Sequence, residues 1–191
     1  MHRVVIVGCS GAGKTTFALR LGEKTGLPVV HLDREFWRPG WTEPSVAVWR
    51  HQVEELAAQP RWIMDGEFRN SLDLRLPRAD TVIFLDMPRW LSLARVARRT
   101  ARHFGRTRVD MAPGCYERFD WTFMKYIWKY KRKVRPRLCA KLAEFGGSLI
   151  VLRSPAEAET YLAQLGKGMV GTLSARSTPD ACSQLLPRTS D

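Results

Sequence analysis

The 191-residue sequence contains no run of ~18 or more apolar residues, so it offers no segment that could cross a membrane as a helix. An apolar run begins at Val4, and no apolar signal region with a cleavage site precedes it. The four cysteines, at positions 9, 115, 139 and 182, form no CxxC pair and no metal-ligand spacing with the four histidines. We therefore expect a cytoplasmic protein with free thiols.

Acidic residues are scarce in one part of the chain. Residues 88–141 contain 16 Lys and Arg but only 3 Asp and Glu, whereas the remainder contains 15 basic and 16 acidic residues. The formal net charge of +12 therefore resides in this segment. A local positive field indicates an anionic partner, such as nucleotide phosphates, a nucleic acid or a membrane surface, although basic runs are also typical of solvated helix faces.

Short apolar runs alternate with helical patterns along most of the chain. Strand-like runs cover residues 3–7, 29–32, 61–64, 81–85 and 148–152, and helical patterns cover 14–24, 44–58, 88–103, 119–145 (with a bend at Pro136) and 155–165. This alternation predicts a right-handed parallel α/β fold. We predict a single domain over residues 1–165 and a disordered tail over residues 166–191, which are rich in Ser, Thr and Gly.

The stretch GCSGAGKT, between a strand-like run and a helical pattern, fits the phosphate-binding motif G-x-x-x-x-G-K-[ST]. Glycines let backbone N–H groups approach phosphate closely, and the following helix directs its positive end at the anion. Lys14 is expected to reach the β- and γ-phosphates and act in catalysis, while the Thr15 hydroxyl binds Mg²⁺. The predicted ATP-binding residues here are Gly8, Cys9, Ser10, Gly11, Ala12, Gly13, Lys14, Thr15 and Thr16.

Three strand-like runs lead into an aspartate: Asp33, Asp65 and Asp86. Ligands of open α/β sheets bind at the carboxyl ends of the strands, so these carboxylates are expected at the site. Mg²⁺ held partly by water needs at least one of them. Each aspartate alone could equally be a turn or helix-capping residue.

Arginines dominate the segment that follows. Arg95 and Arg99 are four residues apart on one helix face, and Arg106, Arg108 and Arg118 lie in a stretch rich in Gly and Pro. A cationic loop over a phosphate site would stabilise charge on a transferring phosphoryl group. It would also exclude water, so that the phosphoryl group passes to another acceptor.

Over roughly residues 1–165, the chain resembles the adenylate kinase-like group of P-loop kinases. Within that group it is similar to the small bacterial DNA topology modulation proteins, through HLDREFWRPGW (31–41), WIMDG (62–66), DTVIFLDMPRW (80–90) and GRTRVDMAPGCYERFDW (105–121). The resemblance implies a P-loop NTPase three-layer sandwich with a five-stranded parallel sheet, order 2-3-1-4-5, and an arginine-rich lid at about residues 104–119.

The resemblance also implies roles for individual residues. DGEFR retains Asp65, Gly66 and Arg69 of an adenylate kinase motif, with Asp65 on Mg²⁺ through water and Gly66 and Arg69 at the acceptor. Asp86 is the second candidate for the magnesium aspartate. Further implied roles are Arg95 over the nucleotide base, Arg99 on the phosphates, Arg106 and Arg108 as catalytic lid arginines, and Arg153 in the loop that passes the adenine.

The identity of the acceptor depends on residues 31–41, which do not match the acceptor-binding stretch of adenylate kinases. If the acceptor is an alcohol, Asp33 is the candidate base or orienting group. If the acceptor is a phosphate, Asp33 would repel it, and Arg38 and Arg69 would have to bind it.

Two functions follow from these patterns. The first is an ATP-dependent phosphotransferase acting on a small acceptor, either a nucleotide or a hydroxyl metabolite. The alternative is an ATP-binding, nucleic-acid-associated protein, because cations and aromatic residues alternate in residues 121–137 and could stack on bases. Most of those aromatic residues recur at helical spacing and are expected in the core. Arginines that converge on the P-loop would favour the phosphotransferase.

Overall fold

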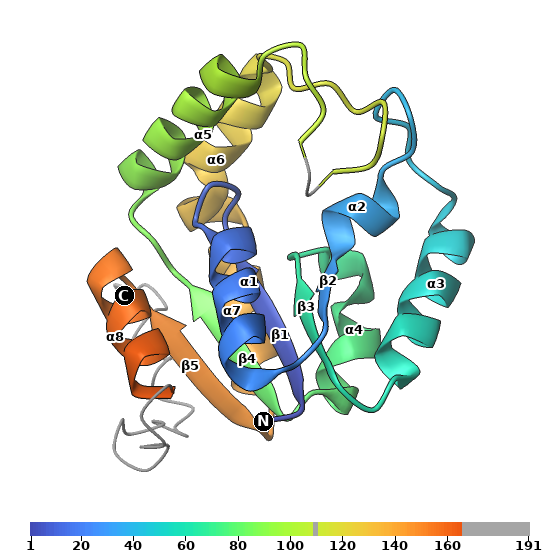
Figure 1. Ribbon diagram of the computed structural model, residues 1–191, viewed down its shortest axis with the longest axis vertical. Coiled ribbons are helices and arrows are strands. Elements are labelled where there is room, and N and C mark those ends of the chain that lie inside the picture. The colour runs from blue at the N-terminus through green and yellow to red at the C-terminus, as the bar shows by residue number, and fades with distance from the viewer. Residues whose placement is uncertain (109–110, 166–191) are drawn as a thin grey trace, which may run out of the picture.

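Five strands form an all-parallel sheet in the order β2-β3-β1-β4-β5, which confirms the predicted fold class (Figure 1). The computed structural model describes residues 1–108 and 111–165, and the predicted disordered tail lies outside this part. Central β1 pairs with β3 through Val5 and Met64, and with β4 through Val5 and Val82. The strands are β1 (Arg3–Gly8), β2 (Val29–His31), β3 (Trp62–Asp65), β4 (Thr81–Leu85) and β5 (Ser148–Leu152).

The helices agree with the predicted pattern in most places. They are α1 (Lys14–Thr25), α2 (Leu32–Phe36), α3 (Val46–Ala58), α4 (Leu72–Arg75), α5 (Arg89–His103), α6 (Trp121–Lys133), α7 (Arg135–Ala143) and α8 (Pro155–Leu165). Two short 3₁₀ turns, η1 (Arg69–Ser71) and η2 (Leu76–Arg78), flank α4.

Two local predictions were wrong. Asp33 does not end a strand, because α2 begins directly after β2 and includes Asp33 in its first turn. The long helix predicted over 119–145 is two helices that meet at Val134. Pro136 lies in the first turn of α7, where its missing N–H breaks no helical hydrogen bond, so the chain starts a new helix there.

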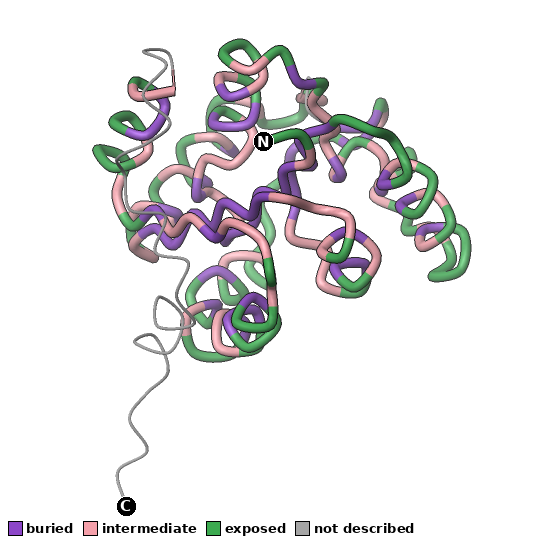
Figure 2. The backbone as a smooth tube through the Cα atoms, turned by 90° about the horizontal axis from the view of Figure 1, so that it is seen from below, coloured by how far each residue is buried: buried purple, intermediate pink, exposed green. Residues whose placement is uncertain are grey.

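The sheet lies between two layers of helices. Alternate residues of β1 point to opposite faces: Val4 and Ile6 pack with α1 and α8, whereas Val5 and Val7 pack with α4 and α7. Figure 2 shows the buried strands running through the middle of the molecule, with the exposed surfaces on the outer sides of the helices. The β-branched strand residues therefore form the core predicted from their apolar runs.

The segment between α5 and α6, here called the lid segment (104–108 and 111–119), reaches the loop that follows α2 (Figure 1). Trp41 Nε1 donates a hydrogen bond to the Tyr116 carbonyl at 2.9 Å, and the Gly40 amide donates to the Gly114 carbonyl at 3.1 Å. Met111, Ala112 and Cys115 are buried against Trp37 and Trp41. These contacts hold the lid segment over the carboxyl edge of the sheet.

A buried arginine fixes the loop after β3. Arg75 donates to the carbonyls of Gly66, Glu67 and Phe68 at 2.9, 2.8 and 3.1 Å. Burial lowers the pKa of its guanidinium to about 9. Phe68 has φ 23°, which is rare for a residue with a side chain. Arg75 therefore holds the loop in an unusual conformation that sets the direction of the Glu67 side chain.

No helix in the described part of the chain is both long and apolar enough to cross a membrane, as the sequence predicted.

Replacing Arg75 by leucine (Arg75→Leu) should destabilise the fold strongly. The change removes the Arg75 donor from the carbonyls of Gly66 and Glu67, and leaving a buried acceptor unsatisfied costs about 1–3 kcal/mol each. Urea unfolding should show a loss of about 3 kcal/mol or more. As a control, Arg78→Leu removes only a 3.9 Å contact between Arg78 and exposed Glu54 and should change stability by less than about 0.5 kcal/mol. Equal, small losses for both variants would contradict the role given to Arg75.

Candidate active site

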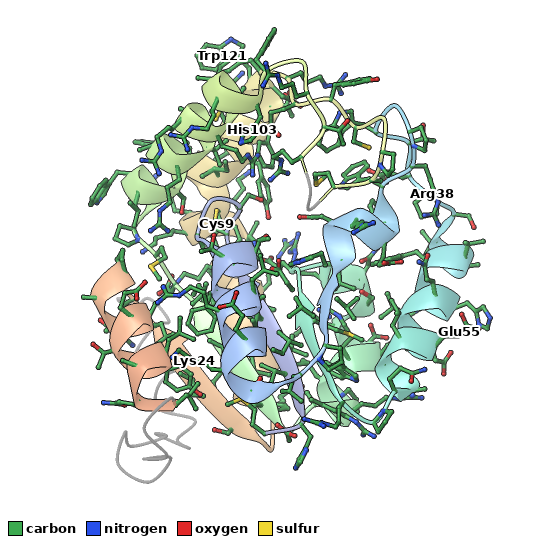
Figure 3. All side chains as sticks on the ribbon, in the orientation of Figure 1. Cys9, Lys24, Arg38, Glu55, His103 and Trp121 are labelled. Carbon is green, nitrogen blue, oxygen red and sulfur yellow. The ribbon has the colours of Figure 1, made fainter. Side chains whose placement is uncertain are left out.

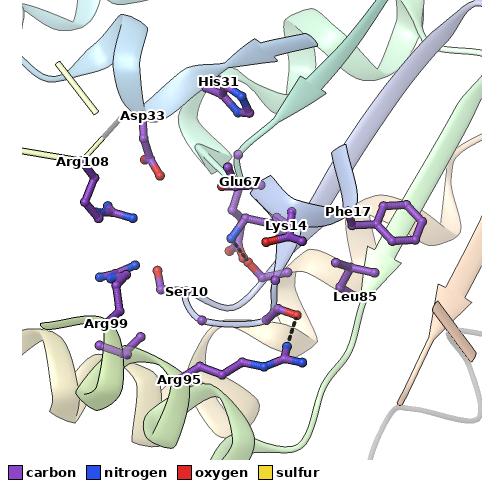
Figure 4. Close-up of a pocket in the computed structure, with 18 of the residues that line it drawn as sticks. Ser10, Lys14, Phe17, His31, Asp33, Glu67, Leu85, Arg95, Arg99 and Arg108 are labelled. Atoms are coloured by element: carbon purple, nitrogen blue, oxygen red, sulfur yellow. Dashed lines mark hydrogen bonds between the residues drawn. The ribbon is translucent and has the colours of Figure 1, made fainter. Parts of the chain in front are cut away.

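A cleft of about 1460 Å³ opens at the carboxyl edge of the sheet. Its walls come from the P-loop (8–15), α2, the loop after β3, α5 and the lid segment. Figure 4 shows Lys14 and Glu67 side by side in the cleft, with Asp33 on one side and Arg99 and Arg108 facing the same space. This is the edge at which ligands bind in open α/β sheets.

The P-loop has the geometry that its sequence predicts. Lys14 Nζ donates to the carbonyls of Gly8 and Cys9 at 3.0 and 3.2 Å, so its amine lies over the loop. Gly13 has φ 96° and immediately precedes α1. A side chain at Gly11 would come within 2.4 Å of the Ser92 carbonyl on α5. Glycine at position 11 therefore brings α5 and its arginines against the phosphate loop.

Most of the predicted phosphate-binding residues line the cleft. They are Gly8, Ser10, Gly11, Ala12, Gly13, Lys14, Thr15 and Thr16. Cys9 differs: it is buried against α5 and α6, and burial raises the pKa of its thiol to about 12. Only its backbone is therefore suited to act on a phosphate.

Four of the predicted arginines, Arg95, Arg99, Arg108 and Arg118, line the cleft. Arg95 Nη1 donates to the Ala12 carbonyl at 2.9 Å, which places its guanidinium against the P-loop. Arg99 and Arg108 line the same cleft from α5 and the lid segment. Arg106 does not: it is exposed and lies outside the described lining. The structure therefore brings Arg95, Arg99, Arg108 and Arg118 to one cleft but leaves out Arg106.

Glu117, which the sequence analysis did not single out, organises these arginines. Its side chain is only 5% exposed, with Oε1 3.2 Å from Arg99 Nε and Oε2 3.0 Å from Arg108 Nε. The Thr100 hydroxyl donates to Oε1 at 2.9 Å. The Glu117 backbone also bonds to Gly105 and Arg106. One buried carboxylate therefore joins α5 to both arms of the lid segment.

The three predicted aspartates have different surroundings. Asp33 lines the cleft from α2. Asp65 is buried beneath it and contacts His31 Nδ1 through Oδ2 at 3.1 Å. Asp86 accepts from Arg135 through both oxygens at 2.8–3.1 Å, and it is not among the described residues that line the cleft. Asp86 therefore fixes the start of α7, which weakens it as a magnesium ligand.

Glu67 is the second carboxylate that the sequence analysis missed. It is 10% exposed and lines the cleft next to Lys14. The Tyr130 hydroxyl donates to Oε2, whereas Oε1 has no hydrogen-bond partner among the described residues. Burial raises the pKa of Glu67, partly offset by the Tyr130 hydrogen bond and by Lys14. A buried carboxylate with a spare oxygen beside the P-loop is suited to a cation or a proton.

Two of the four predicted acceptor-binding residues line the cleft, and the other two lie outside its described lining. Asp33 and Gly66 line the cleft. Arg38 points toward α3 and donates to the Glu35 carbonyl and Gln52 Oε1 (Figure 3). Arg69 Nε lies 3.6 Å from Glu67 Oε1 and is outside the described lining. The two arginines expected to meet an acceptor phosphate are thus both engaged elsewhere.

Two other features complete the site. Trp37 and Trp41 line the cleft, with ring centroids 5.3 Å apart at an interplanar angle of 70°.

Arg153, predicted in the adenine loop, is exposed, and its backbone N–H donates to Glu157. The neighbouring Pro155 lines the cleft, so the loop reaches the site although Arg153 is not part of the described lining.

Local signals for the missed residues were weak. Glu117 is one of only three acidic residues in the cationic segment 88–141, and an acid among so many arginines could have indicated a charge partner. Glu67 lies inside DGEFR, in which the adenylate kinase motif assigns roles to Asp65 and Arg69 but none to Glu67. Both acquire their surroundings from distant helices, which sequence spacing does not reveal.

Known proteins resemble the chain mainly in fold. A family model of isopentenyl transferases matches residues 1–69, which contain the P-loop and Asp33. A structure of shikimate kinase from Acinetobacter baumannii with shikimate has a TM-score of 0.51 and 18% identity, covering 90% of this chain and 96% of that one. A gluconokinase from Sinorhizobium meliloti 1021 has a TM-score of 0.48 and 16% identity, covering 87% and 94%.

A deoxyadenosine kinase from M. mycoides with bound dCTP is more distant, with a TM-score of 0.41, 14% identity, and coverage of 86% and 99%. No curated protein matches the chain. The likeness to shikimate kinase supports the P-loop kinase fold. None of these matches bears on the resemblance to DNA topology modulation proteins, which stays a prediction.

Removing the charge of Glu117 (Glu117→Gln) should impair catalysis more than folding. The amide can still accept the Thr100 hydrogen bond but no longer offsets the repulsion between Arg99 and Arg108. Misplaced catalytic groups cost about 10²-fold in rate, so kcat of ATP consumption should fall by about that factor. The melting temperature, measured alongside, should change far less than for Arg75→Leu. Exposed Glu54→Gln is the control, and unchanged kcat in Glu117→Gln would refute the role.

The neutral variant Glu67→Gln should be more stable than the wild type at neutral pH. Because the folded state raises the pKa of Glu67 above its ordinary value of 4.5, ionisation there disfavours folding. The gain should be absent below pH 4.5 and grow as pH rises above it. Thermal melts at several pH values test whether the stability difference between Glu67→Gln and the wild type has this sign, with Glu54→Gln as the control. A loss of stability at neutral pH would contradict the assigned surroundings.

Proposed function

We propose that the chain is an ATP-dependent phosphotransferase that moves the γ-phosphoryl group of ATP to a small acceptor. One observation carries the proposal: Lys14 of the P-loop, the guanidinium groups of Arg99 and Arg108, and the carboxylate of Asp33 line one cleft. A carboxylate opposite the phosphate loop is suited to orient or deprotonate an acceptor hydroxyl. This arrangement supports transfer between two bound molecules.

ATP would bind as donor with its phosphates in the P-loop. The backbone N–H groups of residues 10–15 and the positive end of α1 would hold the phosphates, while Lys14 would leave its two carbonyl contacts for the β- and γ-phosphates. Arg95 already packs on Ala12, which supports its assignment beside the nucleotide.

Magnesium fits the oxygen groups at the same place. Thr15 would offer its hydroxyl, and Glu67 Oε1, which accepts no hydrogen bond among the described residues although Arg69 Nε lies 3.6 Å away, would bind directly or through water. Asp65 has a similarly unpartnered Oδ1 but is deeper, so Glu67 joins it as a candidate ahead of Asp86. Within the described chain no three His, Cys, Asp or Glu side chains gather as a metal site. Bound Mg²⁺ would offset negative charge on the phosphates.

The lid arginines supply the remaining charge stabilisation. Arg99 and Arg108 would contact the transferring group as negative charge spreads over its oxygens. The lid segment, held by Trp41 and Glu117, would keep bulk water from the cleft, which favours the acceptor over hydrolysis.

The alternative function, a nucleic-acid-associated ATP-binding protein, is supported by the outer surface of α5 and α6. Trp90, Trp121 and Trp128 are 67%, 70% and 56% exposed, and the Arg89 guanidinium lies 4.8 Å from the Trp128 ring. Exposed indoles beside cations can stack on bases. The convergence of Arg95, Arg99 and Arg108 on the P-loop favours the phosphotransferase, and affinity for single-stranded DNA that falls steeply with salt would favour the alternative.

The variant Lys14→Ala should abolish ATP consumption while leaving the fold intact. Lys14 contacts the loop and the cleft rather than the core, so the far-UV circular dichroism and melting temperature should stay close to those of the wild type. The rate is measured as ADP formation with a panel of acceptors. Lys24→Ala, at the far end of α1, is the matched control. Persistent turnover in Lys14→Ala would show that the P-loop assignment is wrong.

A further inference from the structure

We propose that the acceptor is an uncharged alcohol that carries a ring, such as a nucleoside or a sugar, and that it is not a nucleoside monophosphate. Its reacting hydroxyl would lie at Asp33 and its ring against Trp37 and Trp41. The inference rests on the proposed function and specifies the substrate class of the same cleft.

Charge on the acceptor side of the cleft disfavours a phosphate. His31, Asp33 and Glu67 face this side, and Glu43 lines its rim. Arg34, exposed on α2, lines the cleft on the same side. A phosphate brought to Asp33 would meet the repulsion of its carboxylate and of Glu67, whereas a neutral hydroxyl would not.

The arginines that would recognise an acceptor phosphate are engaged elsewhere. Arg38 donates to Glu35 and Gln52 at the outer surface, and Arg69 pairs with Glu67. Arg99 and Arg108 do face the cleft, Arg108 between Asp33 and Arg99 in Figure 4, but both contact Glu117. Their charge suits the transferring phosphoryl group, and an acceptor phosphate would compete with that group for it.

Trp37 and Trp41 would bind a neutral acceptor through contact with its ring, without the help of charge. Trp37 and Trp41 meet edge to face, so an indole face is available to a ring in the cleft. Trp41 has φ 63° and is held in this conformation by its hydrogen bond to Tyr116. Strained backbone beside a cleft is common where a side chain must be positioned for a ligand. Indole faces pack well against nucleobases and against the C–H face of sugars.

The chemistry at Asp33 balances with a neutral alcohol. The acceptor hydroxyl oxygen forms a bond to the γ-phosphorus, and the bond from that phosphorus to the bridging oxygen of ADP breaks. The hydroxyl proton passes to the Asp33 carboxylate and then to solvent. The products are the phosphate monoester and ADP, with no oxidant or further reactant.

The test compares uncharged acceptors with their own monophosphates. Adenosine, thymidine and glucose are each paired with the corresponding monophosphate, and acceptor-dependent ADP formation is measured with the full chain. We expect at least one uncharged compound to give a kcat/KM at least 10-fold above that of its monophosphate. Nucleosides and sugars are separate arms, so the same data identify which ring is bound. Turnover with monophosphates but not with uncharged compounds would overturn the inference and leave the phosphotransferase standing.

Two substitutions locate the acceptor. Asp33→Asn should lower kcat by about 10²-fold or more with unchanged calorimetric affinity for ATP, as expected on losing a general base. Trp37→Leu should raise the KM for the acceptor with little change in kcat, and Trp128→Leu, exposed on α6, should change neither. Equal loss of ATP affinity in Asp33→Asn would place Asp33 on the metal instead and reject this assignment.

Calorimetry with ATP and Mg²⁺ distinguishes a failure of the proposed phosphotransferase function from a failure of the proposed acceptor class. If ATP does not bind, the proposed function itself fails. If ATP binds through Lys14 but none of the uncharged compounds raises ADP formation, only the assignment of the acceptor class is rejected.

Discussion

The burial of Glu117 between Arg99 and Arg108 is the interaction on which the cleft depends. Two guanidinium groups that face the same space repel each other, and a phosphate-binding site has to keep them there before any phosphate arrives. The carboxylate removes that repulsion, and its backbone bonds tie the two arms of the lid segment together. A carboxylate with less than a tenth of its surface exposed is costly to bury without such partners, so the cluster forms together or not at all.

The lid segment also joins the two sides of the cleft through hydrogen bonds. Tyr116, next to Glu117, accepts the hydrogen bond of the Trp41 indole, and Gly114 bonds to Gly40. The loop after α2 and the arginines of α5 are therefore connected through residues 114–117.

Sequence patterns predicted what depends on local periodicity. The five strands, the P-loop and the convergence of Arg95 and Arg99 follow from apolar runs and fixed spacings, whereas the strand order was implied by the resemblance to adenylate kinase-like proteins. The direction of Arg38 and the partners of Asp86 do not, because Gln52 and Arg135 come from elements 14 and 49 residues away. Glu67 and Glu117 were missed for the same reason: the chemistry of each is set by burial and by a partner from another helix. The α2 helix was missed because five residues are too few to show a period.

Trp37 and Trp41 have a consequence beyond binding. Of the seven tryptophans, Trp49 and Trp62 are wholly buried, and Trp90, Trp121 and Trp128 are largely solvated. The remaining two are half-buried at the junction between the cleft and the lid segment. The emission spectrum of the unlabelled protein therefore contains a component that reports on this junction alone. The molecule carries an internal optical probe of whether its lid segment is seated, and no dye is needed to follow that contact in time.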